Sequence, residues 1–260
     1  MAAVPTYDAA QLAGVLAILP DVDAVELKLT VPDDDQRSAV RALGIDPLDA
    51  VVRQVAFVET PDLRLSAAGV VVRARRTQRK PGDLTVKLRP MLPADVPADL
   101  RDRDGFKVEV DASPAGYTCS CSLTVEVPDR KVRRLMEGTR AQSDLLADSQ
   151  RALLHERMPA GVGLADLSVL GPVNLLKCRS TPPGHRRRMV AELWVLPGGG
   201  RILELSTKAP PDEAFQAAAE TKVLLAGHGI DLTAPQETKT RSALAALAAE
   251  RAGNDAGAGD

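Results

Sequence analysis

Charged and apolar side chains alternate along six segments of the chain. The charged positions of these segments are Glu26-x-Lys28, Arg73-x-Arg75, Thr85-x-Lys87, Lys107-x-Glu109-x-Asp111, Lys177-x-Arg179 and Glu204-x-Ser206-x-Lys208. Side chains two residues apart share one face of a β-strand, so each segment has a charged face and an opposite face of Val, Leu and Ile. Six faces that mix Lys and Arg with Glu predict a rolled sheet whose charged faces meet in a common interior. Such an interior would suit a polyanion together with a cation.

The same periodicity divides the chain into strands and helices. We predict strands over 24–31, 51–59, 70–76, 84–89, 105–111, 175–179, 189–196 and 202–206, with 123–127 as a further strand or a lead-in. Apolar residues at helical spacing predict helices over 36–43, 211–228 and 239–251, and one or two helices within 129–157. The order predicts an α+β fold built mostly from antiparallel hairpins. We divide the chain into an N-terminal lead-in at 1–22, one domain at 23–250 and a disordered tail at 251–260.

The composition narrows the classes of partner. Aromatic residues make up 2% of the chain, too few for the stacking platforms that read single-stranded nucleic acid, and the net charge of −2 gives no overall attraction to DNA or to a membrane surface. No apolar run approaches the ~18 residues of a membrane span. The three cysteines have no metal-type spacing, which favours a reducing, cytoplasmic location. No sequence feature indicates an oligomeric state.

One continuous stretch is similar to a known family. Residues 57–76, FVETPDLRLSAAGVVVRARR, resemble the corresponding stretch of CYTH domains, the triphosphate tunnel metalloenzyme superfamily. Weaker matches follow in the family's order at 84–88, 107–110, 176–179, 191–193, 203–206 and 237–241. The resemblance covers roughly residues 23–247, which is nearly all of the predicted domain.

The resemblance implies a fold and an activity. Members of this family form an antiparallel, eight-stranded β-barrel with helices packed outside, and its tunnel binds a triphosphate with basic residues and Mg²⁺ or Mn²⁺ with carboxylates. We therefore expect a protein that binds a small-molecule triphosphate or polyphosphate and hydrolyses it with a divalent metal. Arg and Lys give charge-assisted bonds to phosphate oxygens, and hard divalent cations prefer carboxylate oxygens, so the pattern of charges agrees with this chemistry.

The resemblance also implies roles for individual residues. The expected phosphate-binding residues are Lys28, Arg73, Arg75, Lys87, Lys177, Arg179 and Lys239. The expected metal-binding carboxylates are Glu26, Glu109, Glu192 and Glu204, of which some would orient the nucleophile instead. The candidates for a direct part in catalysis are Glu109, Lys28 and Arg179. Lys177 shares a strand face with Arg179 and is either a further phosphate contact or a charge at the rim.

Two carboxylates of the family pattern are missing from this chain. The family opens with glutamate-x-glutamate-x-lysine, where this chain has Ala24, Glu26 and Lys28, and its late glutamate-x-glutamate is Glu204-Leu-Ser206 here. The loss of two charged oxygens weakens the expected affinity for a divalent ion. Either Asp111 or another acid compensates, or the metal binds weakly and catalysis is slow.

These gaps leave three functions open. The first is a metal-dependent triphosphatase. The second is a non-catalytic module that holds triphosphate or polyphosphate around a degenerate metal site. The third is a class IV-type adenylate cyclase, which rests on the resemblance alone because no sequence feature recognises adenine.

Overall fold

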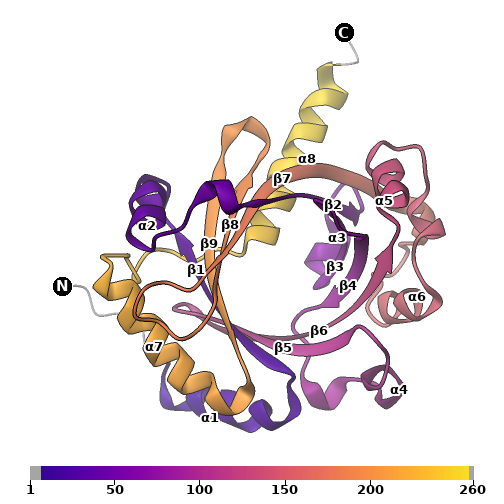
Figure 1. The fold of residues 1–260 in the computed structure, drawn as a ribbon. Coiled ribbons are helices and arrows are strands. Elements are labelled where there is room, and N and C mark those ends of the chain that lie inside the picture. The colour runs from indigo at the N-terminus through magenta and orange to yellow at the C-terminus, as the bar shows by residue number, and fades with distance from the viewer. Residues whose placement is uncertain (1–6, 258–260) are drawn as a thin grey trace.

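The chain folds into a closed β-barrel surrounded by helices (Figure 1). The structure is a computed structural model and describes residues 7–257. The strands are β1 (Ala24–Val31), β2 (Val51–Glu59), β3 (Val70–Thr77), β4 (Gly82–Leu88), β5 (Phe106–Ser113), β6 (Gly116–Val127), β7 (Ser168–Ser180), β8 (Met189–Val195) and β9 (Arg201–Ala209). They pair in the order β1-β5-β6-β4-β3-β2-β7-β8-β9, and β9 pairs with β1 to close the barrel. The predicted α+β barrel with outer helices is confirmed.

Two details of the predicted barrel differ from the structure. The barrel has nine strands where we expected eight, and it is not wholly antiparallel because β1 and β5 run parallel. The parallel pair arises at closure, where the first strand lies between β5 and the last strand, β9. The segment 123–127, which we left as a strand or a lead-in, is the end of the twelve-residue strand β6.

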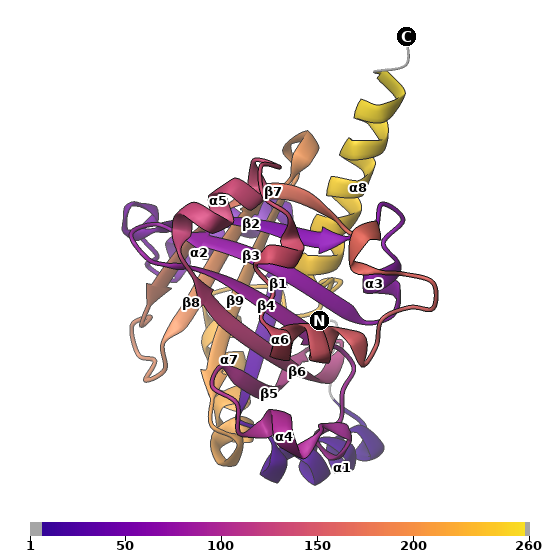
Figure 2. The ribbon, with the colours of Figure 1, turned by 90° about the vertical axis from the view of Figure 1, so that its right-hand side faces the viewer.

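Helices cover the outer face of the barrel, as Figures 1 and 2 show from two sides. They are α1 (Ala9–Ile18), α2 (Gln36–Ala42), α3 (Arg64–Ala67), α4 (Ala98–Arg101), α5 (Asp129–Met136), α6 (Asp148–His155), α7 (Ala214–Gly227) and α8 (Lys239–Gly257). Apolar residues of α1, α5 and α6 pack in one cluster with the outward side chains of β3, β4 and β6. A second cluster joins α2 and α7 to the outer face of β1 and β9. The hydrophobic core therefore lies between the barrel wall and the helices, which leaves the interior for charged side chains.

Helix α8 is the exception, because it packs against side chains that face the interior. Leu244 and Leu247 of α8 lie in one apolar cluster with Phe57 and Trp194. Trp194 shares a strand face with Glu192, two residues before it, and Phe57 is the cross-strand partner of Arg73. The first turns of α8 therefore fill one end of the barrel interior, while its last turns extend beyond the barrel (Figure 2).

The helix α8 is also longer than the sequence predicts. We expected it to end at Arg251 with a disordered tail at 251–260, but the helix continues to Gly257. Residues 258–260 lie outside the described part of the chain, as do residues 1–6 of the expected lead-in at 1–22. Residues 9–18 of that lead-in form the helix α1.

Candidate polyanion site in the barrel interior

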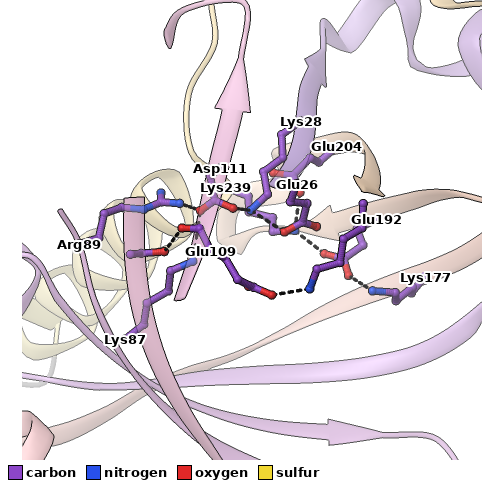
Figure 3. A network of polar contacts seen from close by, with 12 residues as sticks. Glu26, Lys28, Lys87, Arg89, Glu109, Asp111, Lys177, Glu192, Glu204 and Lys239 are labelled. Carbon is purple, nitrogen blue, oxygen red and sulfur yellow. Dashed lines mark hydrogen bonds and ion pairs between the residues drawn. The ribbon is translucent and has the colours of Figure 1, made fainter. Parts of the chain in front are cut away.

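The strand register brings the charged positions of different strands side by side. Across β7, β8 and β9, Lys177 pairs with Glu192, and Glu192 pairs with Glu204. Across β9, β1 and β5, Lys208 is opposite Glu26, which is opposite Asp111. Paired residues point to the same side of a sheet, so these charges line one surface. The alternation in the sequence thus becomes a continuous charged interior, drawn in part in Figure 3.

Asp111 is the centre of one group of contacts in this interior. Its carboxylate lies 2.8 Å from the Lys28 ammonium and 3.1 Å from the Lys87 ammonium, and it also forms an ion pair with Arg89. Only 8% of Asp111 is exposed. One buried carboxylate therefore holds three cations, Lys28 from β1 and Lys87 and Arg89 at the end of β4, and Figure 3 shows them around it.

A second group forms where α8 enters the barrel. The Lys239 ammonium donates hydrogen bonds to Glu192 at 2.5 Å and to Glu204 at 2.6 Å. Glu192 also accepts a hydrogen bond from Lys177 at 2.8 Å. Burial opposes the ionisation of Glu192, but the charges of Lys239 and Lys177 outweigh it and hold the pKa of this carboxyl far below its usual range. Two carboxylates from neighbouring strands thus converge on one cation.

The remaining predicted carboxylates each face a lysine. Glu26 lies 3.1 Å from Lys28, and Glu109 forms an ion pair with Lys208. Burial disfavours the charged form of Glu26, yet the positive charges of Lys28 and Lys239 prevail and lower its pKa to about 2. Both carboxylates are therefore ion-paired with lysines of the chain itself.

Three guanidinium groups lie close together without enough acid to neutralise them. Burial, followed by repulsion from Arg75, lowers the pKa of Arg53 to about 10, and the same two causes lower the pKa of Arg73. Arg75 has its own partner, Asp83, at 2.8 Å, and Arg53 lies 3.6 Å from Glu192, which also binds Lys177 and Lys239. The Nε of Arg73 is buried and has no hydrogen-bond partner among the described residues. This end of the interior therefore has an excess of positive charge and at least one N–H donor without an acceptor in the described part of the chain.

The pKa of Lys87 is strongly lowered in this interior. Burial, then repulsion from Lys28 and Arg89, lowers its pKa to about 7. The nearby carboxylates of Glu109 and Glu26 oppose this shift but do not overcome it. An incoming anion would relieve the repulsion and favour the charged form of Lys87.

Most of the predicted site residues meet in this interior. Lys28, Lys87, Lys177 and Lys239 join its ion-pair network, as do all four predicted carboxylates. Arg73 and Arg75 lie beside the network on β3, whereas Arg179 is exposed near the end of β7 and forms no ion pair with a described residue. The roles of these residues in binding or catalysis stay predictions.

Sequence reasoning assigned no role to four members of the site. Lys208 was recognised as part of the alternation over 204–208 but was given no role, and Arg89 continues the alternation of Thr85 and Lys87 beyond β4. Asp83 could have been found as the cross-strand partner of Arg75. Arg53 is the single basic residue of the mostly apolar segment 51–59, and no alternation pointed to it.

The most specific part of the family resemblance has a structural role. Glu59 is 2% exposed, and its carboxylate accepts hydrogen bonds from the backbone N–H groups of Thr60, Leu65 and Ser66. It thereby fixes the turn and the short helix α3 that lead from β2 into β3. At the end of α3, Gly69 has a φ of +76°, and a Cβ there would lie 2.1 Å from the carbonyl oxygen of Arg89. The segment from Glu59 to Gly69 therefore positions Arg73 and Arg75 and does not itself line the site.

The positions of the two missing carboxylates are occupied by residues that cannot bind a metal strongly. Ala24 is opposite Glu109, and Ser206 is opposite Lys28. Asp111, the candidate to compensate, is already bound to three cations. Among the described residues, no group of three or more His, Cys, Asp or Glu side chains is arranged to hold a metal ion.

A smaller metal site does fit the donors that are present. Mg²⁺ commonly binds one or two carboxylates together with substrate phosphates and water, and does not need a cage made only of protein. Glu192 and Glu204 converge on one position, which the Lys239 ammonium occupies in place of a metal ion. These two carboxylates could hold a divalent ion if Lys239 moves aside.

Comparison with known proteins supports the fold and adds no family assignment. No family model matches the chain, and no curated protein matches it. Among solved structures, a "putative adenylate cyclase" from Bacillus halodurans has a TM-score of 0.59 and 14% identity, over 85% of this chain and 97% of that one. A "putative adenylyl cyclase" from Hippeastrum, HpAC1, described as having a dominant triphosphatase activity, has a TM-score of 0.57 and 15% identity, over 83% and 92%. At these identities the likeness shows a shared barrel fold alone.

The helices of the structure were also compared with the length and hydropathy that a bilayer requires. None of the helices within residues 7–257 combines enough length with enough apolar character to cross a membrane.

Proposed function

We propose that this protein binds a linear triphosphate, or the end of a longer polyphosphate, in the interior of its barrel. The observation that carries the proposal is the excess of positive charge there. The residues described above whose register or contacts place them on the interior side of the strands are ten basic and six acidic ones, so the basic residues are in excess by four. The basic set is Lys28, Arg53, Arg73, Arg75, Lys87, Arg89, Lys177, Arg179, Lys208 and Lys239, and the acidic set is Glu26, Asp83, Glu109, Asp111, Glu192 and Glu204.

A triphosphate would give partners to the Nε groups of Arg53 and Arg73, which have none within the described part of the chain, and would add to the one acidic partner that Arg75 has there. Its oxygens can accept charge-assisted hydrogen bonds from Arg53, Arg73 and Arg75, which now repel one another. The planar guanidinium group binds two phosphate oxygens at once, which suits a chain of linked phosphates. Because part of the site is already neutralised by its own acids, the remaining charge favours a compact polyanion over an ordinary monoanion.

The second part of the proposal is hydrolysis of the bound triphosphate with Mg²⁺ or Mn²⁺. When bound, the metal would polarise a phosphoryl oxygen and neutralise developing charge. Glu192 and Glu204 are the residues placed to hold it. Lys28 and Arg179 would bind the reacting phosphates, and Glu109 would orient the attacking water. The triphosphatase activity of the HpAC1 protein, which has the same fold, supports this part.

The strongest alternative is a module that binds without hydrolysis. The observation in its favour is that Ala24 and Ser206 stand where the family pattern has carboxylates, and that every remaining carboxylate of the expected metal set is ion-paired with a lysine. An adenylate cyclase is the third candidate, and only the names of the structurally similar proteins support it. We also propose a reducing, cytoplasmic location, in keeping with three free and buried cysteines.

Calorimetric titration with tripolyphosphate in EDTA tests the binding proposal. We expect binding at one site per chain, weakened on the order of 10- to 100-fold in Arg73→Ala because a charge-assisted bond is lost. Arg130→Ala, which removes an exposed arginine on α5, is the matched control and should leave the affinity unchanged. Absence of binding, or equal losses in both variants, would refute the interior site.

A second assay separates the enzyme from the binding module. Phosphate release from tripolyphosphate, thiamine triphosphate and ATP is measured with Mg²⁺ and with Mn²⁺, and cyclic AMP is measured in the ATP reactions. Metal-dependent release from one of the triphosphates supports hydrolysis. Tight binding without release supports the module, and cyclic AMP formation would replace both with the cyclase.

A further inference from the structure

A separate apolar cavity lies outside the barrel, between its wall and two helices. Its volume is about 420 Å³, and it is lined by residues of α1 and α7 and by the outward side chains of β1, β5 and β9. Figure 1 shows α1 and α7 together beside these strands. The lining includes Val15, Leu27, Val110, Leu205 and Ala218. The cavity is thus separated from the charged interior by the thickness of the barrel wall.

The cavity reaches the surface at its edge. Leu12 of α1 and Phe215 of α7 both line it, and they are 38% and 45% exposed. Large apolar side chains that remain half exposed at the mouth of an apolar cavity are typical of a ligand entrance. A small molecule could therefore enter without unfolding the helices.

One polar group inside the cavity lacks a partner. Thr221 lines the cavity from α7 and is 8% exposed, and its hydroxyl oxygen is buried with no hydrogen-bond partner among the described residues. A buried polar group without a partner costs roughly 1–3 kcal/mol. Most such groups are satisfied in folded proteins, so this hydroxyl points to a missing ligand atom.

The charge at the cavity edge is positive. The next residue, Lys222, lines the cavity and is exposed. Lys28 also contributes to the lining, but its ammonium forms ion pairs with Glu26 and Asp111 in the barrel interior. Among the described lining residues, Lys222 is therefore the one whose charge is available to a ligand in this cavity. An anionic headgroup beside Thr221 would meet both a hydroxyl and an ammonium.

From these observations we propose that the cavity binds a small amphiphile with an apolar chain and a single anionic headgroup, such as a medium-chain carboxylate. The size agrees, because an apolar cavity of about 150 Å³ holds benzene, so 420 Å³ accommodates roughly 17 non-hydrogen atoms. The apolar chain lies among the side chains of α1, β1 and α7. Its carboxylate lies near the edge, where it faces Lys222 and accepts a hydrogen bond from Thr221 once that side chain rotates its buried hydroxyl toward the cavity.

The test uses the full-length protein and sodium dodecanoate, which has about 14 non-hydrogen atoms, at concentrations well below micelle formation. Calorimetric titration should show one dodecanoate per chain. Dodecyltrimethylammonium, with the same chain and a positive headgroup, should bind more weakly because of Lys222. Absence of dodecanoate binding, or equal affinity for both amphiphiles, would overturn the proposal.

A matched pair of variants locates the ligand. Ala218→Phe fills the cavity and should abolish dodecanoate binding, whereas Ala219→Phe adds the same side chain at an exposed neighbouring position of α7 and should leave it intact. Equal behaviour of the two variants would place the ligand elsewhere. Thermal unfolding of both variants establishes that each is folded.

Two further variants test the headgroup and do not depend on the tolerance of the cavity for Phe. Thr221→Val should weaken dodecanoate binding about two- to tenfold and also raise the melting temperature of the ligand-free protein, because an unpaired buried hydroxyl is removed. Lys222→Gln should weaken binding about two- to fivefold, and Lys80→Gln, in the loop between β3 and β4, should not change it. A lower melting temperature in Thr221→Val, together with unchanged binding, would show that the hydroxyl has a structural role and would overturn its assignment to the ligand.

Discussion

At the scale of single residues, the charge of Lys87 depends most on what the barrel contains. Its pKa is lowered to about 7, so the free protein loses this charge as the pH rises through 7. A bound polyanion stabilises the ammonium and raises the pKa. At pH 8 we therefore predict that triphosphate binding takes up a proton at Lys87, whereas at pH 5.5 this uptake is absent. The affinity should fall as the pH rises from 6 to 8.

Proton uptake is measured by calorimetry at pH 8 in buffers of different ionisation enthalpy. The triphosphate's own titration contributes equally in all variants. The difference in proton uptake between Lys87→Met and the unchanged protein is therefore the uptake by Lys87. Lys107→Met, which removes an exposed lysine from β5, should retain the full uptake. If Lys87→Met retains it as well, another group carries the proton.

Glu59 leads to a prediction about stability. Its buried carboxylate accepts hydrogen bonds from three backbone N–H groups of the turn before β3. Because the carboxylate is buried, water cannot readily take its place as the acceptor in a variant that lacks it. Glu59→Ala should lower the free energy of unfolding by about 2 kcal/mol or more. Glu126→Ala, on an exposed position of β6, should change it by less than about 0.5 kcal/mol. Urea denaturation of both variants checks the difference, and equal values would refute the capping role.

At the scale of elements, the contact between α8 and the strands β8 and β9 places Lys239 between the two carboxylates that we propose as metal ligands. In Lys239→Met, the carboxylates of Glu192 and Glu204 lose their shared cation and repel each other. We predict that this variant is less stable at neutral pH than the unchanged protein. We also predict that about 1 mM Mn²⁺ raises its melting temperature by about 3 °C, by binding between the two freed carboxylates.

The control for this prediction removes a different lysine. Lys208→Met frees the single carboxylate of Glu109, which gives a divalent ion too few ligands, so Mn²⁺ should not shift its melting temperature. Thermal scans with Mn²⁺ and with EDTA compare the two variants and the unchanged protein. A shift of equal size in Lys208→Met, or none in Lys239→Met, would contradict the convergence of Glu192 and Glu204 on one cation.

The elements themselves show which parts of the fold the sequence could predict. The strand β1 begins and ends where the alternation predicts, because its two faces differ sharply in polarity. The strand β2 also has the predicted bounds, although it is a mostly apolar segment without that alternation. The first part of β6 was missed because its inward positions Thr118, Ser120 and Ser122 carry hydroxyls and no charge. In β7, the register shift opposite Val55 and Phe57 interrupts the alternation, so the strand starts seven residues before the predicted 175.

The site was predictable to the extent that it depends on side-chain direction. Alternation along a strand places Lys28, Glu109 and Glu204 on the inner face whatever the pairing of the strands. Which charges meet depends on the register and on α8, which join residues as distant as Lys239 and Glu192. The sequence has no local signal for such contacts, and this is why the shared cation position remained hidden.

At the scale of the whole molecule, the excess of positive charge lies inside the barrel and the excess of negative charge lies outside it. The net charge of the chain is −2, and the interior set described above carries an excess of +4, so the rest of the chain has a net charge of −6. A polyanion thin enough to enter the barrel meets positive charge, whereas a large one meets a negative surface. The molecule should therefore select polyanions by their cross-section as well as by their charge.

This separation predicts opposite results for two polyanions. Tripolyphosphate should bind at 50 mM NaCl and weaken about tenfold by 500 mM, because added ions screen its attraction to the interior. A double-stranded DNA of 20 base pairs should not bind at micromolar concentration even at 50 mM NaCl, because its phosphates cannot reach Arg73 and its neighbours. Fluorescence anisotropy of labelled DNA and calorimetry of tripolyphosphate provide the two measurements. DNA that binds and competes with tripolyphosphate would show that the basic residues are accessible from the surface, and the interior would then not be the selective site.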